Sequence, residues 1–278
     1  GGAALVDALV RGLEKHDGKL LLKSHVEEII VENKRAVGVR LRNGEELRAD
    51  VVISNASVWD TLKLIPSESV PQQFFEKRRE TPECESFMHL HLGIDARDLK
   101  DLQCHYIYVE DWELGITAPQ NLVLISIPSV MDSSLAPPGK HAIHVYTPGS
   151  EPYDLWKGMD RNSKEYLQQK QNRAEIMWSA LEKIIPDIRS RCEVTLIGTP
   201  LTHERYLRRH NGSYGPAIRA GSGLFPGSKT PIPGLMCCGD STFPGIGLPA
   251  VAASGMIAAN TIATVEKHLE MLKEVVSG

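Results

Sequence analysis

Apolar residues recur every three to four positions near the start of the chain and alternate with polar ones further on. Leu5, Leu9 and Leu13 lie on one face of a predicted helix that stops near Gly18. Short strands are predicted beyond it, and Asn43-Gly44 is typical of a tight turn between two strands. The predicted strands cover residues 19–22, 25–31, 37–41 and 51–53. The first 56 residues therefore predict one helix, a small hairpin and a return strand, as in part of an α/β domain.

The middle of the chain, residues 57–200, has a different pattern. Two short helices are predicted at 58–65 and 70–79, and a long helix at 163–185 ends before Pro186. Strands are predicted at 87–94, 106–109, 122–127, 142–146 and 193–197. Several strands with short links followed by a helix predict an antiparallel sheet with helices on one side.

The most informative segment begins at Leu235 and continues into a helix of small residues. Residues 235–238 predict a buried strand, which Gly239 and Asp240 end. Gly245 and Gly247 then lead into a helix that starts at Ala250. A helix N-terminus preceded by glycines exposes backbone N–H groups and a positive dipole end, which suit a pyrophosphate or a flavin oxygen. The segment therefore predicts close approach to a cofactor.

Two other interpretations of this segment are weaker. Residues 245–250 match G-x-G-x-x-A, but a dinucleotide fingerprint follows its strand directly and has its acid about 20 residues later. Here Asp240 precedes the glycines, so we reject a nicotinamide-type site. No Asp, Glu, Lys or Arg occurs from Ser241 to Val265, but prolines, glycines and small residues favour a buried helix over a membrane span.

The motif at residues 239–255 resembles the C-terminal flavin motif of the phytoene desaturase and carotenoid isomerase family, which also includes retinol saturases. Residues 1–13 resemble the family's glycine-led helix, and 24–33, 36–45 and 49–56 resemble its following strands. The resemblance implies FAD as cofactor and a long hydrophobic polyene as substrate. The implied cofactor-binding residues are Val26, whose backbone would face the adenine, Asn55, Gly239, Asp240 toward the ribityl or phosphate region, Gly245, Ile246, Gly247 and Ala250. Tyr214 and Gly215 are candidates for the cavity beside the isoalloxazine ring.

One half of such a cofactor site is missing from the sequence. No strand–GxGxxG–helix unit precedes Gly1, so we expect a fragment, a truncated gene model or a variant that lost its nucleotide half. The predicted fold class is α/β with an α+β substrate part, a flavoprotein fold without that unit. We expect residues 1–56 to belong to the FAD-binding domain and 57–200 to the substrate domain. Residues 201–278 would return to the FAD-binding domain, with the flavin motif at 234–260.

Composition limits the function classes. The net charge is −4 without a basic block, which argues against nucleic-acid binding. Five cysteines without C-x-x-C spacing favour a reducing compartment. His89 and His91 lie on one face of a predicted strand, but no third ligand has a diagnostic spacing, so we expect structural histidines and no metal. No catalytic acid or base can be named.

The sequence thus predicts an FAD-dependent enzyme that isomerises or desaturates a carotenoid-like polyene. The alternatives are a retinol-saturase-like or amine-oxidase-like flavoenzyme, or a non-catalytic protein that binds a lipophilic molecule. Peripheral membrane contact at an apolar entrance is a hypothesis. The expected compartment is the plastid if the source is a plant, and otherwise the cytoplasm or a membrane surface. The oligomeric state is left open.

Overall fold

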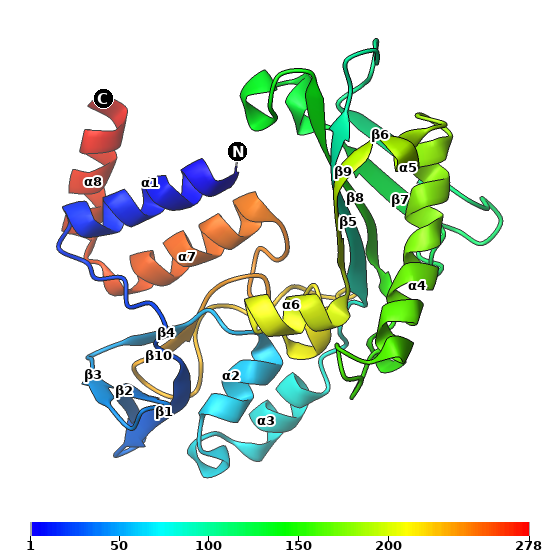
Figure 1. The fold of residues 1–278 in the computed structure, drawn as a ribbon. Helices are drawn as coiled ribbons and strands as arrows, with labels where there is room; N and C mark the ends of the chain where they lie inside the picture. The colour runs from blue at the N-terminus through cyan, green and yellow to red at the C-terminus, as the bar shows by residue number, and fades with distance from the viewer. Residues whose placement is uncertain (1, 278) are drawn as a thin grey trace.

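Segments from the two ends of the chain meet in one small parallel sheet. The computed structural model describes residues 2–277, so Gly1, the first residue of the predicted helix, lies outside them. Strand β4 (Val52–Ser54) pairs in parallel with β10 (Leu235–Cys237). Helices α1 (Gly2–Lys15), α7 (Leu248–Ile262) and α8 (Val265–Ser277) occupy the same end of the molecule in Figure 1. Residues near positions 54 and 238 are thereby brought together.

A three-stranded antiparallel sheet packs next to the β4–β10 pair. Its order is β1 (Val26–Glu32), β2 (Arg35–Leu41) and β3 (Glu46–Arg48). Gly44 has a φ of 85°, and the Asn43 side chain accepts a hydrogen bond of 3.1 Å from the backbone N–H of Glu45. Both features fit the predicted turn, because glycine adopts positive φ without a side-chain clash. The hairpin predicted from the sequence is confirmed.

Two predictions near the chain ends are wrong. Lys19–Leu22 forms no strand, and Leu20, Leu21 and Leu22 are 50%, 55% and 74% exposed. No described strand lies beside this segment to accept its backbone hydrogen bonds, and an apolar run alone does not make a strand. Helix α7 is not a buried helix, because only Ser254 and Ala258 in it are buried. Its small side chains pack on one side only.

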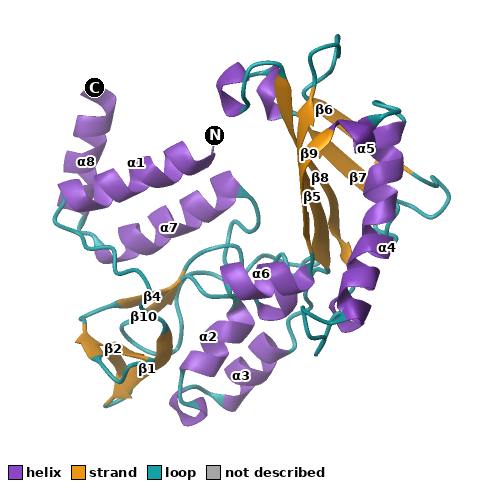
Figure 2. Ribbon diagram, in the orientation of Figure 1, coloured by secondary structure: helices purple, strands orange, loops and turns teal. Residues whose placement is uncertain are grey.

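A five-stranded antiparallel sheet forms the other part of the molecule, as predicted (Figure 2). The strand order is β6 (His105–Val109), β7 (Leu122–Ser126), β8 (Lys140–Glu151), β5 (Ser86–Asp95) and β9 (Cys192–Gly198). Helices α4 (Lys164–Glu182) and α5 (Ile188–Arg191) lie on one side of the sheet in Figure 2. That side holds the main core, which includes Met88, Leu90, Val145, Met177 and Leu181.

The opposite face of this sheet is not covered by α4. Because side chains alternate along a strand, Phe87, His89 and His91 of β5 share this second face, next to His144 and Tyr146 of β8. The face therefore carries aromatic and imidazole rings where the α4 side carries aliphatic ones.

Shorter helices connect the two parts of the molecule. Ser57 caps α2 (Val58–Leu64) by accepting a hydrogen bond of 3.1 Å from the N–H of Asp60. A reciprocal capping box between Thr199 and Thr202 begins α6 (Pro200–Leu207). The remaining helices are α3 (Gln72–Arg79) and the 3₁₀ turns η1 (Ser67–Ser69), η2 (Pro128–Val130), η3 (Ser133–Leu135), η4 (Tyr153–Leu155) and η5 (His210–Gly212). Within residues 2–277, no helix is both long enough and apolar enough to cross a bilayer.

Candidate cofactor site and adjoining sheet face

The turn after β10 is tied to the neighbouring elements by hydrogen bonds. The Cys238 N–H donates to the Ser54 carbonyl at 2.9 Å, and the Gly239 N–H donates to Ser254 Oγ at 2.7 Å. Ser254 lies on α7 and is buried, and its hydroxyl donates in turn to the Val251 carbonyl at 2.7 Å. The strand end, the turn and the helix therefore form one connected unit.

Two glycines of this unit have backbone angles that other residues rarely adopt. Gly239 has a φ of 96°, and a Cβ added there would lie 2.2 Å from Asn55 Oδ1. Gly247 has a φ of 104° and precedes α7, where no side chain caps the helix. A Cβ added at Gly247 would meet nothing within 4 Å among the described residues. Open space thus faces an uncapped helix N-terminus.

These features fit an anionic part of a flavin nucleotide. The first N–H groups of a helix have no partner within the helix, and the positive end of the helix dipole attracts negative charge. Glycine at position 247 lets a ligand approach the backbone without contacting a side chain. Ala250, in the first turn of α7, adds only a methyl group. The individual roles predicted for Gly239, Gly245, Ile246, Gly247, Ala250 and Asn55 stay predictions, although Asn55 does lie against Gly239.

Asp240 has a partner that the sequence did not reveal. Its carboxylate accepts a hydrogen bond from Arg209 Nη1 in a mostly buried ion pair, and Ser241 Oγ donates to it at 3.3 Å. Arg209 also donates to the Ser213 carbonyl. The Asp240 carboxylate thereby fixes the loop at residues 209–215 against the flavin motif. Its predicted role toward the ribityl or phosphate region stays a prediction.

Tyr214 and Gly215 join the flavin motif to the sheet face opposite α4. Gly215 is buried with a φ of 120°, and a Cβ there would lie 3.4 Å from Ile246 Cγ1 and 3.6 Å from the Asp240 carbonyl oxygen. The Tyr214 ring is edge-on to Phe87 with the ring centroids 4.4 Å apart. Phe87 then stacks on His89 at 5.6 Å and contacts Tyr146 at 6.2 Å. A continuous row of rings leads from the motif onto the sheet.

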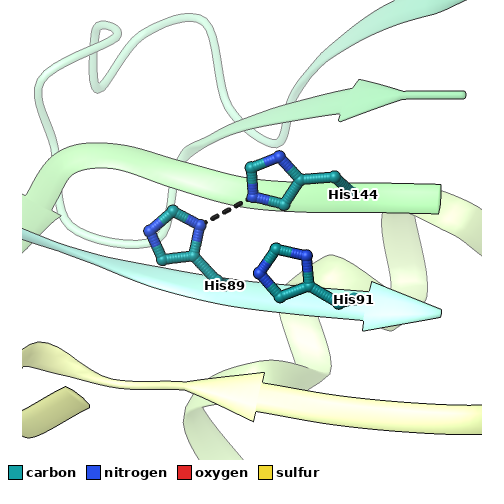
Figure 3. Close-up of side chains that lie close together, drawn as sticks. All are labelled: His89, His91 and His144. Atoms are coloured by element: carbon teal, nitrogen blue, oxygen red, sulfur yellow. Dashed lines mark hydrogen bonds between the residues drawn. The ribbon is translucent and has the colours of Figure 1, made fainter. Parts of the chain in front are cut away.

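Three histidines lie together farther along this face (Figure 3). The β5–β8 register places His91 opposite His144, and the His89 Nδ1 and His144 Nε2 atoms are 2.8 Å apart in a hydrogen bond. Burial and the neighbouring imidazoles lower the pKa of His89 to about 3, and burial with the field of His91 lowers the pKa of His144 to about 4. Both rings are therefore neutral at neutral pH.

Sequence reasoning missed the contribution of His144 to this group. His89 and His91 are two residues apart, whereas His144 comes from a strand that begins at Lys140, far along the chain. The alternation in both predicted strands was visible, but the register between them was not. Val26, by contrast, begins β1 where predicted and is half-buried opposite Leu41. Its expected contact with the adenine stays a prediction.

The decisive comparison is with a family model. The model of the flavin containing amine oxidoreductase family matches residues 1–263. The chain belongs to this family. The cofactor is accordingly FAD, as the sequence predicted, and the resemblance to carotenoid isomerases and desaturases is confirmed.

Two relatives agree with this assignment, and a solved structure shares the fold. The chain is 39% identical over 269 residues to the chloroplastic prolycopene isomerase of Daucus carota. This match covers 95% of the chain and 43% of the relative. It is 28% identical over 285 residues to a 4,4'-diapophytoene desaturase (4,4'-diapolycopene-forming) of Methylomonas sp., covering 96% of the chain and 53% of the relative. An oxidoreductase structure from Methanosarcina mazei has the same fold, with a TM-score of 0.62, 24% identity, and coverage of 92% of this chain and 53% of that one. The chain spans about half the length of the curated relatives it matches.

Proposed function

We propose that this chain supplies one side of the FAD site and the substrate wall of an enzyme that isomerises cis double bonds in a carotenoid-like polyene. Isomerisation is favoured over desaturation because the chain is 39% identical to the prolycopene isomerase and 28% identical to the desaturase. Each relative covers nearly the whole chain, so the difference is not due to one short segment.

The row of rings from the flavin motif onto the sheet carries the proposal. Tyr214 is exposed and Tyr146 is half-buried, so both offer flat apolar surface, while the buried Phe87 ring contacts and supports them. His89 adds a neutral ring because its pKa is lowered to about 3. A polyene is a long flat chain of conjugated carbons, and aromatic faces bind such surfaces through dispersion and burial of apolar area. The row begins beside Ile246 and Asp240, so a polyene lying along it would pass next to the flavin motif.

The residues of this chain would bind and orient rather than transfer protons. A bound flavin supplies hydride acceptance for desaturation or, in its reduced form, assistance to isomerisation without net redox change. The α7 N-terminus would hold an anionic part of the cofactor, with Gly247 allowing close approach. The Arg209–Asp240 pair would keep Tyr214 at the start of the ring row.

Two further parts of the proposal concern the cellular compartment of the enzyme and its contact with a membrane. The Daucus carota relative is named as chloroplastic, and we extend that compartment to this chain if its source is a plant. A polyene dissolves in bilayers, so the enzyme would take it up at a membrane surface by peripheral contact. Co-sedimentation with liposomes tests this contact, and a protein that stays in the supernatant at every lipid concentration would exclude it.

The experiment joins this chain to the part of the Daucus carota protein that the chain does not cover, and supplies FAD. We expect flavin absorbance to stay with the fusion after gel filtration, and the fusion to convert prolycopene into a product of unchanged mass and altered retention time. A product lighter by two hydrogens would show desaturation, and one heavier by two hydrogens would show saturation. Either product, or a fusion that retains no flavin, would overturn the proposal.

A matched pair of variants tests the role of the ring row. Tyr214→Ala removes the ring that contacts Phe87, whereas Tyr214→Phe keeps the ring and loses only the hydroxyl. An aromatic contact is worth about 0.5–1.5 kcal/mol, so the alanine variant should raise KM about two- to thirteenfold and the phenylalanine variant should not. Equal KM values for the two variants would remove Tyr214 from the substrate wall.

A further inference from the structure

The three histidines on the sheet face opposite α4 form a compact group of nitrogen donors. One ring nitrogen from each of His89, His91 and His144 lies within 4.8 Å of the others. His89 and His91 share a face of β5, and His144 is on the paired strand β8, as Figure 3 shows. The backbone positions are therefore fixed by a paired sheet, and a ligand would need only side-chain movement.

We propose that His89, His91 and His144 form a binding site for one divalent transition-metal ion, such as Zn²⁺, Co²⁺, Ni²⁺ or Cu²⁺. Neutral imidazole suits these ions, and three protein nitrogens leave at least one coordination position open. Mg²⁺ and Ca²⁺ require oxygen ligands, and the group contains no carboxylate, so these two ions do not fit it. This proposal replaces the expectation from the sequence that the histidines are only structural.

The unpaired nitrogens of this region support the proposal. His89 Nε2 and His203 Nε2 are buried and have no hydrogen-bond partner among the described residues. The His203 ring lies 4.7 Å from the His89 ring. A buried polar atom without a partner is costly, so such atoms are rare in folded proteins. Figure 3 shows His89 Nδ1, and not Nε2, on the side of His144 and His91, so an ion held by all three rings would satisfy His89 Nε2 only after the His89 ring turns over.

Metal binding requires the rings to turn. The three rings are nearly parallel, with interplanar angles of 2° to 11°. Each lone pair lies in its own ring plane, so parallel rings cannot all direct one at the same point. A tetrahedral ion with bonds of about 2.0–2.1 Å also needs its donors about 3.3 Å apart. Binding would therefore break the His89–His144 hydrogen bond and rotate the rings inward.

The surroundings leave room for this rotation. His91 is exposed, so its ring can move without displacing the core. Gly198 of β9 lies opposite His89, and a Cβ there would come within 3.3 Å of His89 Cβ. The absence of that methyl group leaves space beside the His89 ring.

The test is a titration of the whole chain with Co²⁺ alone, after treatment with a chelator. We expect saturable binding of one ion per chain, with visible ligand-field bands and competition by Zn²⁺. Loss of a residue that hydrogen-bonds to a metal ligand typically weakens metal binding about 10–100-fold. His91→Ala removes a ligand itself, so it should weaken Co²⁺ binding at least about tenfold. His144→Ala should have the same effect.

The matched control is His105→Ala on β6 of the same sheet. His105 is exposed and bonds to Ser126, so its removal should leave Co²⁺ binding unchanged. Circular dichroism checks that each variant is folded. If His144→Ala unfolds, the test rests on His91→Ala, because His91 is exposed and its removal should not disturb the fold. No saturable binding by the unaltered chain, or equal affinities for it and His91→Ala, would overturn the proposal. The titration uses neither flavin nor polyene, so its failure would leave the proposed function standing.

Discussion

Replacing Arg173 with methionine tests what holds α4 to the sheet. The Glu151 carboxylate at the end of β8 is fully buried, and Arg173 of α4 donates to it from Nε at 2.9 Å and from Nη2 at 2.6 Å. Trp156 Nε1 donates a third hydrogen bond at 2.8 Å. Removing one partner of a buried ion pair costs about 3–5 kcal/mol, because the other charge stays buried and unpaired. The Arg173 side chain is 21% exposed, so we expect Arg173→Met to lower the free energy of unfolding by about 3 kcal/mol, at the lower end of this range.

The double variant Arg173→Met, Glu151→Gln separates charge from packing. The neutral amide still accepts the Trp156 hydrogen bond but leaves no unpaired charge, so we expect most of the lost stability to return. Urea unfolding followed by circular dichroism gives the free energy of unfolding for each variant. A loss below about 1 kcal/mol in Arg173→Met would be typical of a surface pair. That result, or a double variant no more stable than the single one, would refute the reasoning.

Three further predictions concern the site. Because the folded-state pKa values of His89 and His144 lie below the usual 6.5, only the unfolded state binds their protons as the pH falls from 6.5 toward 4. The urea concentration at the unfolding midpoint should therefore decrease as the pH falls through that window, and the decrease should be smaller in His89→Gln. A midpoint that does not change with pH would contradict the burial of these rings. Ser254→Ala leaves the Gly239 N–H without its acceptor and should cost about 1–3 kcal/mol in urea unfolding, whereas Thr261→Ala on the exposed part of α7 should cost little. Gly247→Val puts a branched side chain into the open space before α7, so the flavin-binding fusion should lose FAD affinity at least about tenfold, and unchanged affinity would place the cofactor elsewhere.

Local sequence signals predicted most of the fold. The alternation in residues 87–94 predicted β5 and its two faces, and Asn43-Gly44 predicted the hairpin turn. These signals succeed because side-chain periodicity and turn geometry depend on neighbouring residues. Lys19–Leu22 shows the limit of such signals. A strand needs a partner to accept its backbone hydrogen bonds, and the apolar run does not specify one.

The site was predictable where its residues are consecutive. The glycines from Gly239 to Gly247 belong to one short segment, so their closeness to the start of α7 followed from the sequence. The Arg209–Asp240 pair and the position of His144 depend on how separate segments pack. Registers between strands and loop positions are set by long-range contacts, which a single sequence does not display.

The loop at residues 209–215 couples the cofactor side of the molecule to the sheet face. At one end Arg209 pairs with Asp240 of the flavin motif, and at the other Tyr214 packs on Phe87 of β5. Between them, Ser86 Oγ donates to the Gly212 carbonyl at 2.7 Å, and a Cβ at Gly212 would lie 2.4 Å from the Pro200 carbonyl oxygen. The loop therefore has little freedom to shift relative to either side. A polyene on the ring row and a flavin at α7 would be held in a fixed relation by this loop, because neither side can move without straining it.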